Sequence, residues 1–131
     1  MKPQSTLENA TLLYAEDDAI LAQDTLSRLH AIGFSRILFA RDLCEAEELA
    51  RQDKIDVALL DVHLGMATTT DLALTLAEDG THIVFTSSYT RDELGDRLEE
   101  FAFLPKPFTL RELSEALEDA IADWPGSLAA E

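Results

Sequence analysis

The sequence predicts an α/β fold in which five parallel strands form a doubly wound sheet with helices on both faces. Short apolar runs alternate along the chain with longer segments of helical spacing, as in repeated βα units. One run, residues 57–60, is apolar at four consecutive positions and is too short for a useful helix. Such a run is typical of a strand buried on both faces of a parallel sheet. It ends on a carboxylate, Asp61, which we expect just past the end of the strand because burying a charge within it is costly.

Three strands and two helices are predicted in the first half of the chain. The helices start at the N-caps Asp18 and Asp42, and Gly33 stops the first of them. Their apolar side chains recur at helical spacing. The predicted strands cover residues 11–15, 34–40 and 55–60, and the helices end at about residues 32 and 52.

The second half of the chain continues the same alternation. A loop at residues 62–67 follows Asp61, and Gly95 weakens one of the three predicted helices. The last helix has a clear apolar stripe that ends at Trp124. The predicted helices cover residues 68–78, 91–100 and 109–124, and the strands cover residues 82–86 and 101–104.

A chain of 131 residues is long enough for one domain with a real core. We expect that domain at residues 11–124, between a flexible lead-in at residues 1–10 and a tail at residues 125–131. The single cysteine, Cys44, excludes an internal disulfide. No apolar run reaches transmembrane length, and the first ten residues lack the apolar centre of a signal peptide. A cytoplasmic protein is therefore expected.

The charge balance is strongly negative. The chain carries 26 acids and 10 bases, for a net charge of −16. Nucleic-acid phosphates and anionic membranes would both be repelled. We therefore expect neither nucleic acid nor membrane among its partners.

Polar residues closely follow four of the five predicted strands. Glu16 and Asp17 follow the first strand, Asp61 the third, Ser87 the fourth and Lys106 the fifth. In a doubly wound sheet of strand order 2-1-3-4-5 these exits share one edge, where ligands bind.

Strand alternation buries one of Thr86 and Ser87 and exposes the other, and Ser87 is the favoured candidate.

The residue types at this edge suit phosphoryl chemistry. Carboxylates that converge without cysteine ligands form the hard oxygen site that Mg²⁺ prefers. Lys106 can hold a phosphoryl oxygen, and Ser87 can donate a hydrogen bond. A carboxylate in this company can accept a phosphoryl group and become an aspartyl phosphate.

Four stretches carry a resemblance to a known family. They are residues 13–18 (LYAEDD), 58–61 (ALLD), 83–89 (IVFTSSY) and 103–108 (FLPKPF). In this order, each at a strand exit, they resemble the receiver domain of bacterial two-component signalling, the flavodoxin-like fold of the chemotaxis response regulator. The resemblance covers residues 11–124.

The resemblance implies a role for each matched residue. Asp61 would be the phosphoacceptor, and Glu16 and Asp17 the acid pair that binds Mg²⁺ with it. Ser87 and Lys106 would assist the transfer, and Ser87 would act with Phe103 as the conformational switch. Because Mg²⁺ prefers oxygen, His63 is expected to contribute its backbone carbonyl to the metal rather than its ring.

Some features depart from the usual pattern. The proline that usually follows the phosphoacceptor loop is absent, and the segments between Asp61, Ser87 and Lys106 are shorter than in most receivers. The loop DVHLG, the strand exit FTSSY and the short fourth helix resemble small stand-alone receivers, common in alphaproteobacteria, that pair with HWE-type histidine kinases.

The expected function is that of a single-domain response regulator. It would accept a phosphoryl group on Asp61 from a histidine kinase or phosphotransfer protein in a Mg²⁺-dependent reaction and would signal to a downstream protein through direct contacts. It would not be an enzyme beyond its own phosphorylation and dephosphorylation.

Two alternatives are weighed against this expectation. A pseudo-receiver would keep the fold without phosphorylation, but the complete acid, serine and lysine set argues against it. A haloacid-dehalogenase-type hydrolase would place its nucleophile after the first strand, with a second acid two residues on. Here Asp61 follows the third strand, and His63 occupies the second position.

Overall fold

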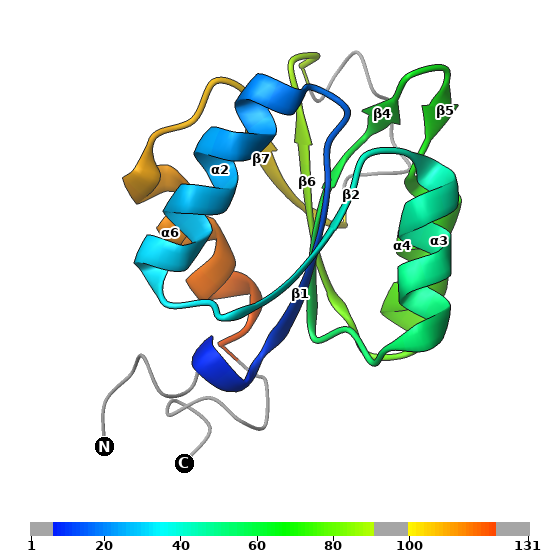
Figure 1. The fold of residues 1–131 in the computed structure, drawn as a ribbon, viewed down its shortest axis with the longest axis horizontal. Helices are drawn as coiled ribbons and strands as arrows, with labels where there is room; N and C mark the ends of the chain where they lie inside the picture. Colours follow the sequence, from blue (N-terminus) through cyan, green and yellow to red (C-terminus); the bar gives the residue numbers. More distant parts are fainter. Residues whose placement is uncertain (1–6, 91–99, 123–131) are drawn as a thin grey trace.

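A computed structural model describes residues 7–90 and 100–122 as a five-stranded parallel sheet between two layers of helices (Figure 1). The strand order β2-β1-β3-β6-β7 is the predicted 2-1-3-4-5 order, because β4 and β5 belong to a separate hairpin. The doubly wound fold is therefore confirmed. The sheet strands are β1 (Thr11–Ala15), β2 (Arg36–Ala40), β3 (Val57–Asp61), β6 (His82–Ser87) and β7 (Ala102–Pro105).

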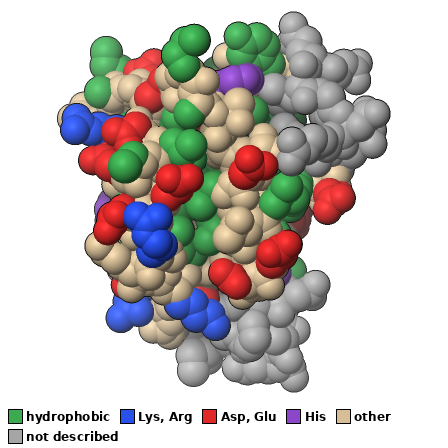
Figure 2. Space-filling view, turned by 90° about the vertical axis from the view of Figure 1, so that its right-hand side faces the viewer, with side chains coloured by type: hydrophobic (Ala, Val, Ile, Leu, Met, Phe, Trp, Pro, Cys, Tyr) green, Lys and Arg blue, Asp and Glu red, His purple; other side chains and the backbone are tan. Residues whose placement is uncertain are grey.

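The helices cover both faces of the sheet. Helices α2 and α6 lie on one face and α3 and α4 on the other (Figure 1). Figure 2 views the side that carries α3 and α4 and shows acidic side chains spread among apolar ones. None of the helices in the described parts of the chain is long and apolar enough to cross a membrane. The bounds are α2 (Ala19–Ile32), α3 (Leu43–Gln52), α4 (Thr70–Glu78) and α6 (Leu110–Ala120).

Strand β3 contributes to both halves of the core. All five of its residues are buried, as the uninterrupted apolar run predicts. Because side chains alternate along a strand, Val57 and Leu59 pack in the cluster that contains α2 and α6 residues, and Ala58 and Leu60 pack in the cluster that contains α3 and α4 residues. Asp61 is the last residue of the strand instead of lying just beyond it. The strand thus presents one buried carboxylate at its C-terminal end.

The predicted helix caps are present. The Asp18 carboxylate accepts the backbone N–H groups of Ile20 and Leu21, and the Asp42 carboxylate accepts that of Glu45. Gly33 ends α2 with φ at 131°, a conformation that favours glycine. These caps set where each helix leaves the sheet edge.

A small hairpin replaces part of the predicted loop and helix after Asp61. Strands β4 (His63–Leu64) and β5 (Ala67–Thr68) pair in antiparallel fashion, with Gly65 at φ 61° in the turn. Helix α4 consequently begins at Thr70, two residues later than predicted. Elements this short carry too little periodicity to be read from sequence.

The N-terminal end of the described chain can be compared with the predicted start of the domain at residue 11. Leu7 and Ala10 are buried in the core cluster that contains α2 and α6 residues, so this part of the expected lead-in packs with the domain. Residues 1–6, most of the predicted helix at residues 91–100, Trp124 and the tail at residues 125–131 lie outside the described residues.

Candidate functional site

The C-terminal ends of the sheet strands and the β4–β5 hairpin surround one pocket of about 240 Å³. It contains six of the seven residues that the sequence singles out, and Phe103 is the exception. Its lining residues are Glu16, Asp17, Asp61, His63, Gly65, Ser87, Ser88, Tyr89 and Lys106.

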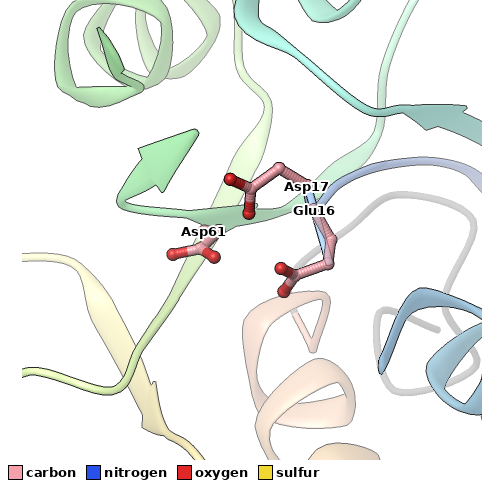
Figure 3. A group of neighbouring side chains, drawn as sticks. All are labelled: Glu16, Asp17 and Asp61. Carbon is pink, nitrogen blue, oxygen red and sulfur yellow. The ribbon is translucent and has the colours of Figure 1, made fainter. Parts of the chain in front are cut away.

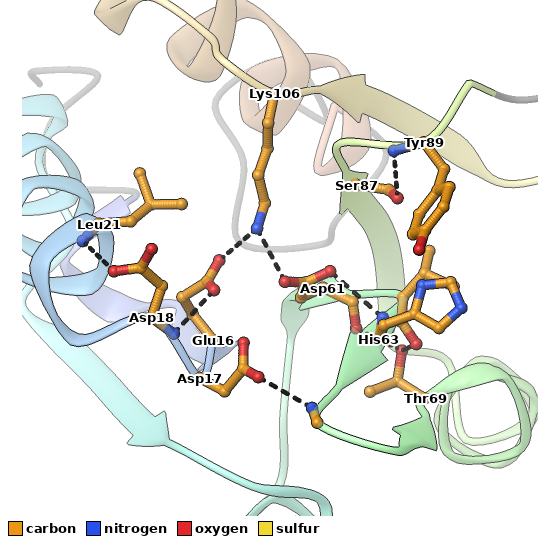
Figure 4. A network of polar contacts seen from close by, with 12 residues as sticks. Glu16, Asp17, Asp18, Leu21, Asp61, His63, Thr69, Ser87, Tyr89 and Lys106 are labelled. Carbon is orange, nitrogen blue, oxygen red and sulfur yellow. Dashed lines mark hydrogen bonds and ion pairs between the residues drawn. The ribbon is translucent and has the colours of Figure 1, made fainter.

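Lys106 joins two of the predicted acids. Its Nζ lies 2.8 Å from Glu16 Oε1 and 2.8 Å from Asp61 Oδ2 (Figure 4). Burial alone would lower the pKa of the Lys106 ammonium, but the hydrogen bonds to Asp61 and Glu16 outweigh it, so this pKa lies above its ordinary value. Lys106 is therefore a fixed positive charge at neutral pH.

Glu16 is the most buried acid of the site, with 2% of its surface exposed. Burial raises the pKa of its carboxyl above the ordinary value, and the hydrogen bonds from Lys106 and from the Asp18 backbone N–H offset only part of that effect. The Asp61 side chain adds to it by like-charge repulsion. The pocket therefore holds more negative charge than one lysine neutralises.

Glu16, Asp17 and Asp61 form a cluster that suits a metal ion (Figure 3). Each offers one carboxylate oxygen, and these oxygens lie within 4.8 Å of one another. The donors are all hard oxygens, and hard cations such as Mg²⁺ prefer such ligands. His63 lines the same pocket, and its backbone carbonyl stays a predicted ligand.

Backbone groups of the hairpin hold two of these acids. Gly65 N–H donates to Asp17 Oδ2 at 2.9 Å, and His63 N–H donates to Asp61 Oδ1 at 3.2 Å. The buried Thr69 hydroxyl donates to the Asp61 carbonyl oxygen at 2.8 Å. Sequence reasoning did not find Gly65 or Thr69, because a main-chain donor and a threonine within a run of threonines carry no distinctive sequence signal.

Thr86 and Ser87 are both buried, so the prediction that strand alternation would expose one of them is wrong. Of the two, only Ser87 lines the pocket, together with Ser88. Thr86 pairs with Asp61 across the sheet and does not line it. Ser87 Oγ accepts the Tyr89 backbone N–H at 3.0 Å, and the Ser87 carbonyl accepts the Lys106 backbone N–H at 2.9 Å. The hydroxyl and the lysine are thus joined through the main chain.

Phe103 lies outside the pocket. It pairs with Phe85 across the sheet and packs, partly buried, against the core cluster on the side of α3 and α4. One strand step separates it from Leu104, which pairs with Thr86. Phe103 is therefore near the site without contributing to its lining.

Two rings meet at one side of the pocket. The His63 and Tyr89 ring centroids are 5.0 Å apart, with the ring planes inclined by 58°. His63 Nδ1 is buried and has no hydrogen-bond partner among the described residues. The ring contact links the hairpin to the exit of β6, and the sequence did not predict it.

The sheet order and this pocket define the fold class. The chain has the receiver-domain fold of two-component response regulators, and solved receivers superpose on it closely. A response regulator receiver protein from Sinorhizobium medicae has a TM-score of 0.77 and is 28% identical, with 88% of this chain and 96% of that chain covered. A CheY-like receiver domain protein from Methanospirillum hungatei has a TM-score of 0.78 at 19% identity, with 87% of this chain and 94% of that chain covered.

Another similar structure is that of a phosphorylated response regulator. A response regulator from Burkholderia pseudomallei was solved with a phosphorylated aspartic acid, a calcium ion and citrate. It has a TM-score of 0.73 at 22% identity and covers 83% of this chain and 66% of its own.

Among curated proteins, the transcriptional regulatory protein PdtaR of Mycobacterium tuberculosis is 30% identical over 115 residues. The match covers 85% of this chain and 56% of that protein, so the chain spans about half the length of this relative. No family model matches the chain.

Proposed function

We propose that this chain is a phosphorylatable receiver that accepts a phosphoryl group on Asp61. The supporting observation is the shared contact of Lys106 Nζ with Asp61 and Glu16, at 2.8 Å each, inside a pocket that also holds Asp17. A buried nucleophilic carboxylate next to a fixed cation is what phosphoryl transfer requires of a protein. The donor is the phosphohistidine of a histidine kinase or of a phosphotransfer protein.

The transfer balances as a simple displacement. The Asp61 carboxylate forms a phosphorus–oxygen bond while the phosphorus–nitrogen bond of the donor breaks. The imidazole leaves with the bonding electron pair and takes its proton from water. Lys106 faces the developing charge on the phosphoryl oxygens, and the Ser87 hydroxyl is free to donate its proton to one of them.

Glu16, Asp17 and Asp61 are the proposed Mg²⁺ ligands, with the His63 carbonyl as a fourth. Their oxygen-only character and their mutual approach within 4.8 Å support this set. When bound, the ion supplies positive charge against the phosphoryl oxygens. The only group that the protein modifies in this proposal is its own Asp61.

The test is the intact mass of the protein after incubation with acetyl phosphate and Mg²⁺. Wild type is expected to gain the mass of one phosphoryl group, and Asp61→Asn to gain none, because the amide keeps the shape but lacks the anionic nucleophile. The control Asp53→Asn removes an exposed carboxylate at the end of α3 and should be labelled like wild type. A wild-type mass gain in Asp61→Asn would place the phosphoryl group on another residue, and no gain in wild type would leave a non-phosphorylated binding module as the better description.

Ser87 and Phe103 are the proposed switch. In the phosphorylated state the Ser87 hydroxyl turns toward the phosphoryl oxygens, an interaction with a charged acceptor worth roughly 1.5–3 kcal/mol. This movement leaves space into which Phe103 rotates from its half-buried position. Ser87→Ala should therefore still be phosphorylated but lose the change in NMR shifts of residues 91–104 that beryllofluoride produces in wild type. A full response in Ser87→Ala would redirect the proposal to Thr86.

The proposed setting follows from the donor chemistry and the charge. Residues 11–124 form the receiver, and the partners are an HWE-type histidine kinase, as the DVHLG and FTSSY stretches suggest, and a downstream protein. Cytoplasmic location, in the compartment that supplies ATP to such a kinase, belongs to the same proposal. With a net charge of −16, the chain is not proposed to bind DNA.

A further inference from the structure

The side chain of Thr69 contacts the main chain of Asp61. Thr69 has 0% of its surface exposed, and its hydroxyl donates to the Asp61 carbonyl oxygen at 2.8 Å (Figure 4). The backbone N–H of Thr69 donates to the next carbonyl, that of Val62, at 2.9 Å. One residue at the start of α4 therefore binds two consecutive carbonyls where β3 ends.

Helix capping does not account for this threonine. A threonine at an N-cap normally accepts a backbone N–H of the first helical turn through its hydroxyl. Thr69 is the N-cap of α4, but its side chain makes no such bond, and its backbone is not extended as it is at the caps Asp18 and Asp42. The Thr69 hydroxyl therefore binds Asp61 and leaves the helix without a side-chain cap.

The contact lies on a part of Asp61 that the proposed reaction does not change. The Asp61 carboxylate is bound by Lys106 Nζ at 2.8 Å and by the His63 N–H at 3.2 Å. These carboxylate oxygens are the atoms that would bond to phosphorus or bind the metal ion, so their surroundings would change during the transfer. The carbonyl oxygen forms no such bond and would keep its contact with Thr69.

We propose that Thr69 is a positioning residue for the phosphoryl transfer, because its hydroxyl fixes the main chain of Asp61 and so holds the carboxylate in reach of Lys106. The inference rests on the proposed phosphorylation of Asp61 and adds a residue that does not line the pocket.

Burial makes this hydroxyl hard to replace. Thr69 and Asp61 have 0% and 6% of their surfaces exposed, so water has little access to the carbonyl. A buried carbonyl that loses a donor is costly, and the main chain shifts to reduce that cost. The shift passes directly to the carboxylate, because both groups belong to Asp61. A misplacement of about 1 Å can slow a chemical step by roughly 100-fold.

The test uses two threonines that make the same kind of bond at opposite ends of β3. Thr69→Val keeps the branched shape of the side chain but cannot donate a hydrogen bond, and Thr69→Ser restores the hydroxyl. Thr81→Val is the matched control. Thr81 is also buried, and its hydroxyl donates at 2.8 Å to the carbonyl of Ile55, which precedes β3 at the end away from the pocket.

Each protein is phosphorylated by acetyl phosphate and Mg²⁺, and its intact mass over time gives the initial rate. Urea unfolding gives the folded fraction by which each rate is divided. Thr69→Val is expected to lose about tenfold in rate, less than a full misplacement would cost, because Lys106 still binds the carboxylate. Thr69→Ser should keep the wild-type rate, and so should Thr81→Val, although it loses an equivalent buried hydrogen bond.

A wild-type rate in Thr69→Val, an equal loss of rate in Thr81→Val, or a rate in Thr69→Ser as low as that of Thr69→Val would each overturn the assignment. If Thr69→Val does not fold, Thr69→Ala and Thr81→Ala replace the valine pair under the same criteria, because alanine is too short to press on either carbonyl. Failure of acetyl phosphate to label wild type would overturn the proposed function, and this inference with it.

Discussion

At the scale of single residues, Glu16 is the unusual feature of the site. Buried carboxylates are normally stabilised by a partner of opposite charge, and Glu16 has one in Lys106. That lysine also contacts Asp61, so one ammonium serves two carboxylates. Burial therefore outweighs the ion pair and raises the pKa of Glu16. Without a cation, the site therefore contains a carboxyl group whose charged form is disfavoured.

The raised pKa of Glu16 predicts that the stability of the metal-free protein depends on pH. Because the pKa of Glu16 is higher in the folded chain than in the unfolded one, the free energy of unfolding falls as pH rises from the ordinary value of 4.5 through the folded-state pKa. Glu16→Gln imitates the protonated form. It should match wild type in stability at acid pH and exceed it at pH near 7, as measured by urea unfolding in the presence of a chelator. A Glu16→Gln protein that is less stable than wild type at neutral pH would contradict the direction of this shift.

The site residues that act through a side chain at the end of a strand could be predicted from the sequence. Asp61, Ser87 and Lys106 are the polar residues that end or follow apolar runs, and parallel strands bring such positions to one edge. The groups that hold them were not predictable. Gly65 acts through its backbone N–H, and the ring contact of Tyr89 with His63 depends on the path of the hairpin.

At the scale of elements, the β4–β5 hairpin supplies backbone groups that hold Asp17 and Asp61 in place. Two strands of two residues cannot persist alone, so the hairpin depends on the hydrogen bonds that Gly65 N–H donates to Asp17 and His63 N–H donates to Asp61. The Thr69 hydroxyl, just after the hairpin, adds a bond to the Asp61 carbonyl. The same reasoning explains the errors of sequence prediction here. The long helices and the apolar strands have periodic patterns and were found, whereas a structure fixed by contacts across the fold was assigned to a loop.

The turn of this hairpin gives a prediction about stability. Gly65 adopts φ 61°, and a Cβ atom at this position would meet no other atom within 4 Å. Gly65→Ala should therefore be destabilised by backbone strain alone, by about 1–2 kcal/mol. Gly65→Asn should lose less, because asparagine tolerates the left-handed region. Urea unfolding of the three proteins tests this order, and an alanine variant as stable as wild type would show that the turn relaxes freely.

At the scale of the whole molecule, the negative net charge causes repulsion between surface side chains. A net charge of −16 on one small domain favours expansion by self-repulsion. Acidic side chains are spread over the side that carries α3 and α4, so the repulsion is not confined to the site (Figure 2). Strand alternation compensates by giving the sheet a buried apolar cluster on each face.

Salt should therefore stabilise this protein. Raising sodium chloride from about 0.01 to 0.15 M shortens the screening length from roughly 30 to 8 Å and weakens the repulsion between surface carboxylates. We expect the melting temperature to rise over this range in chelator-treated protein, as measured by circular dichroism. A melting temperature that falls with salt would mean that attractive ion pairs dominate the surface.

The hydrogen bond from Lys106 N–H to the Ser87 carbonyl restricts how a signal can begin. Ser87 ends β6 and Lys106 directly follows β7, so this bond couples the main chains that carry two of the side chains lining the pocket. In the proposed switch, the first event after phosphorylation of Asp61 would be a rotamer change of Ser87. Rotamer changes take picoseconds to nanoseconds at exposed positions, but Ser87 is only 1% exposed, so its rotation needs its packed neighbours to move. The proposed switch would therefore respond more slowly than an exposed side chain could, and part of the delay in a response would lie in the domain itself.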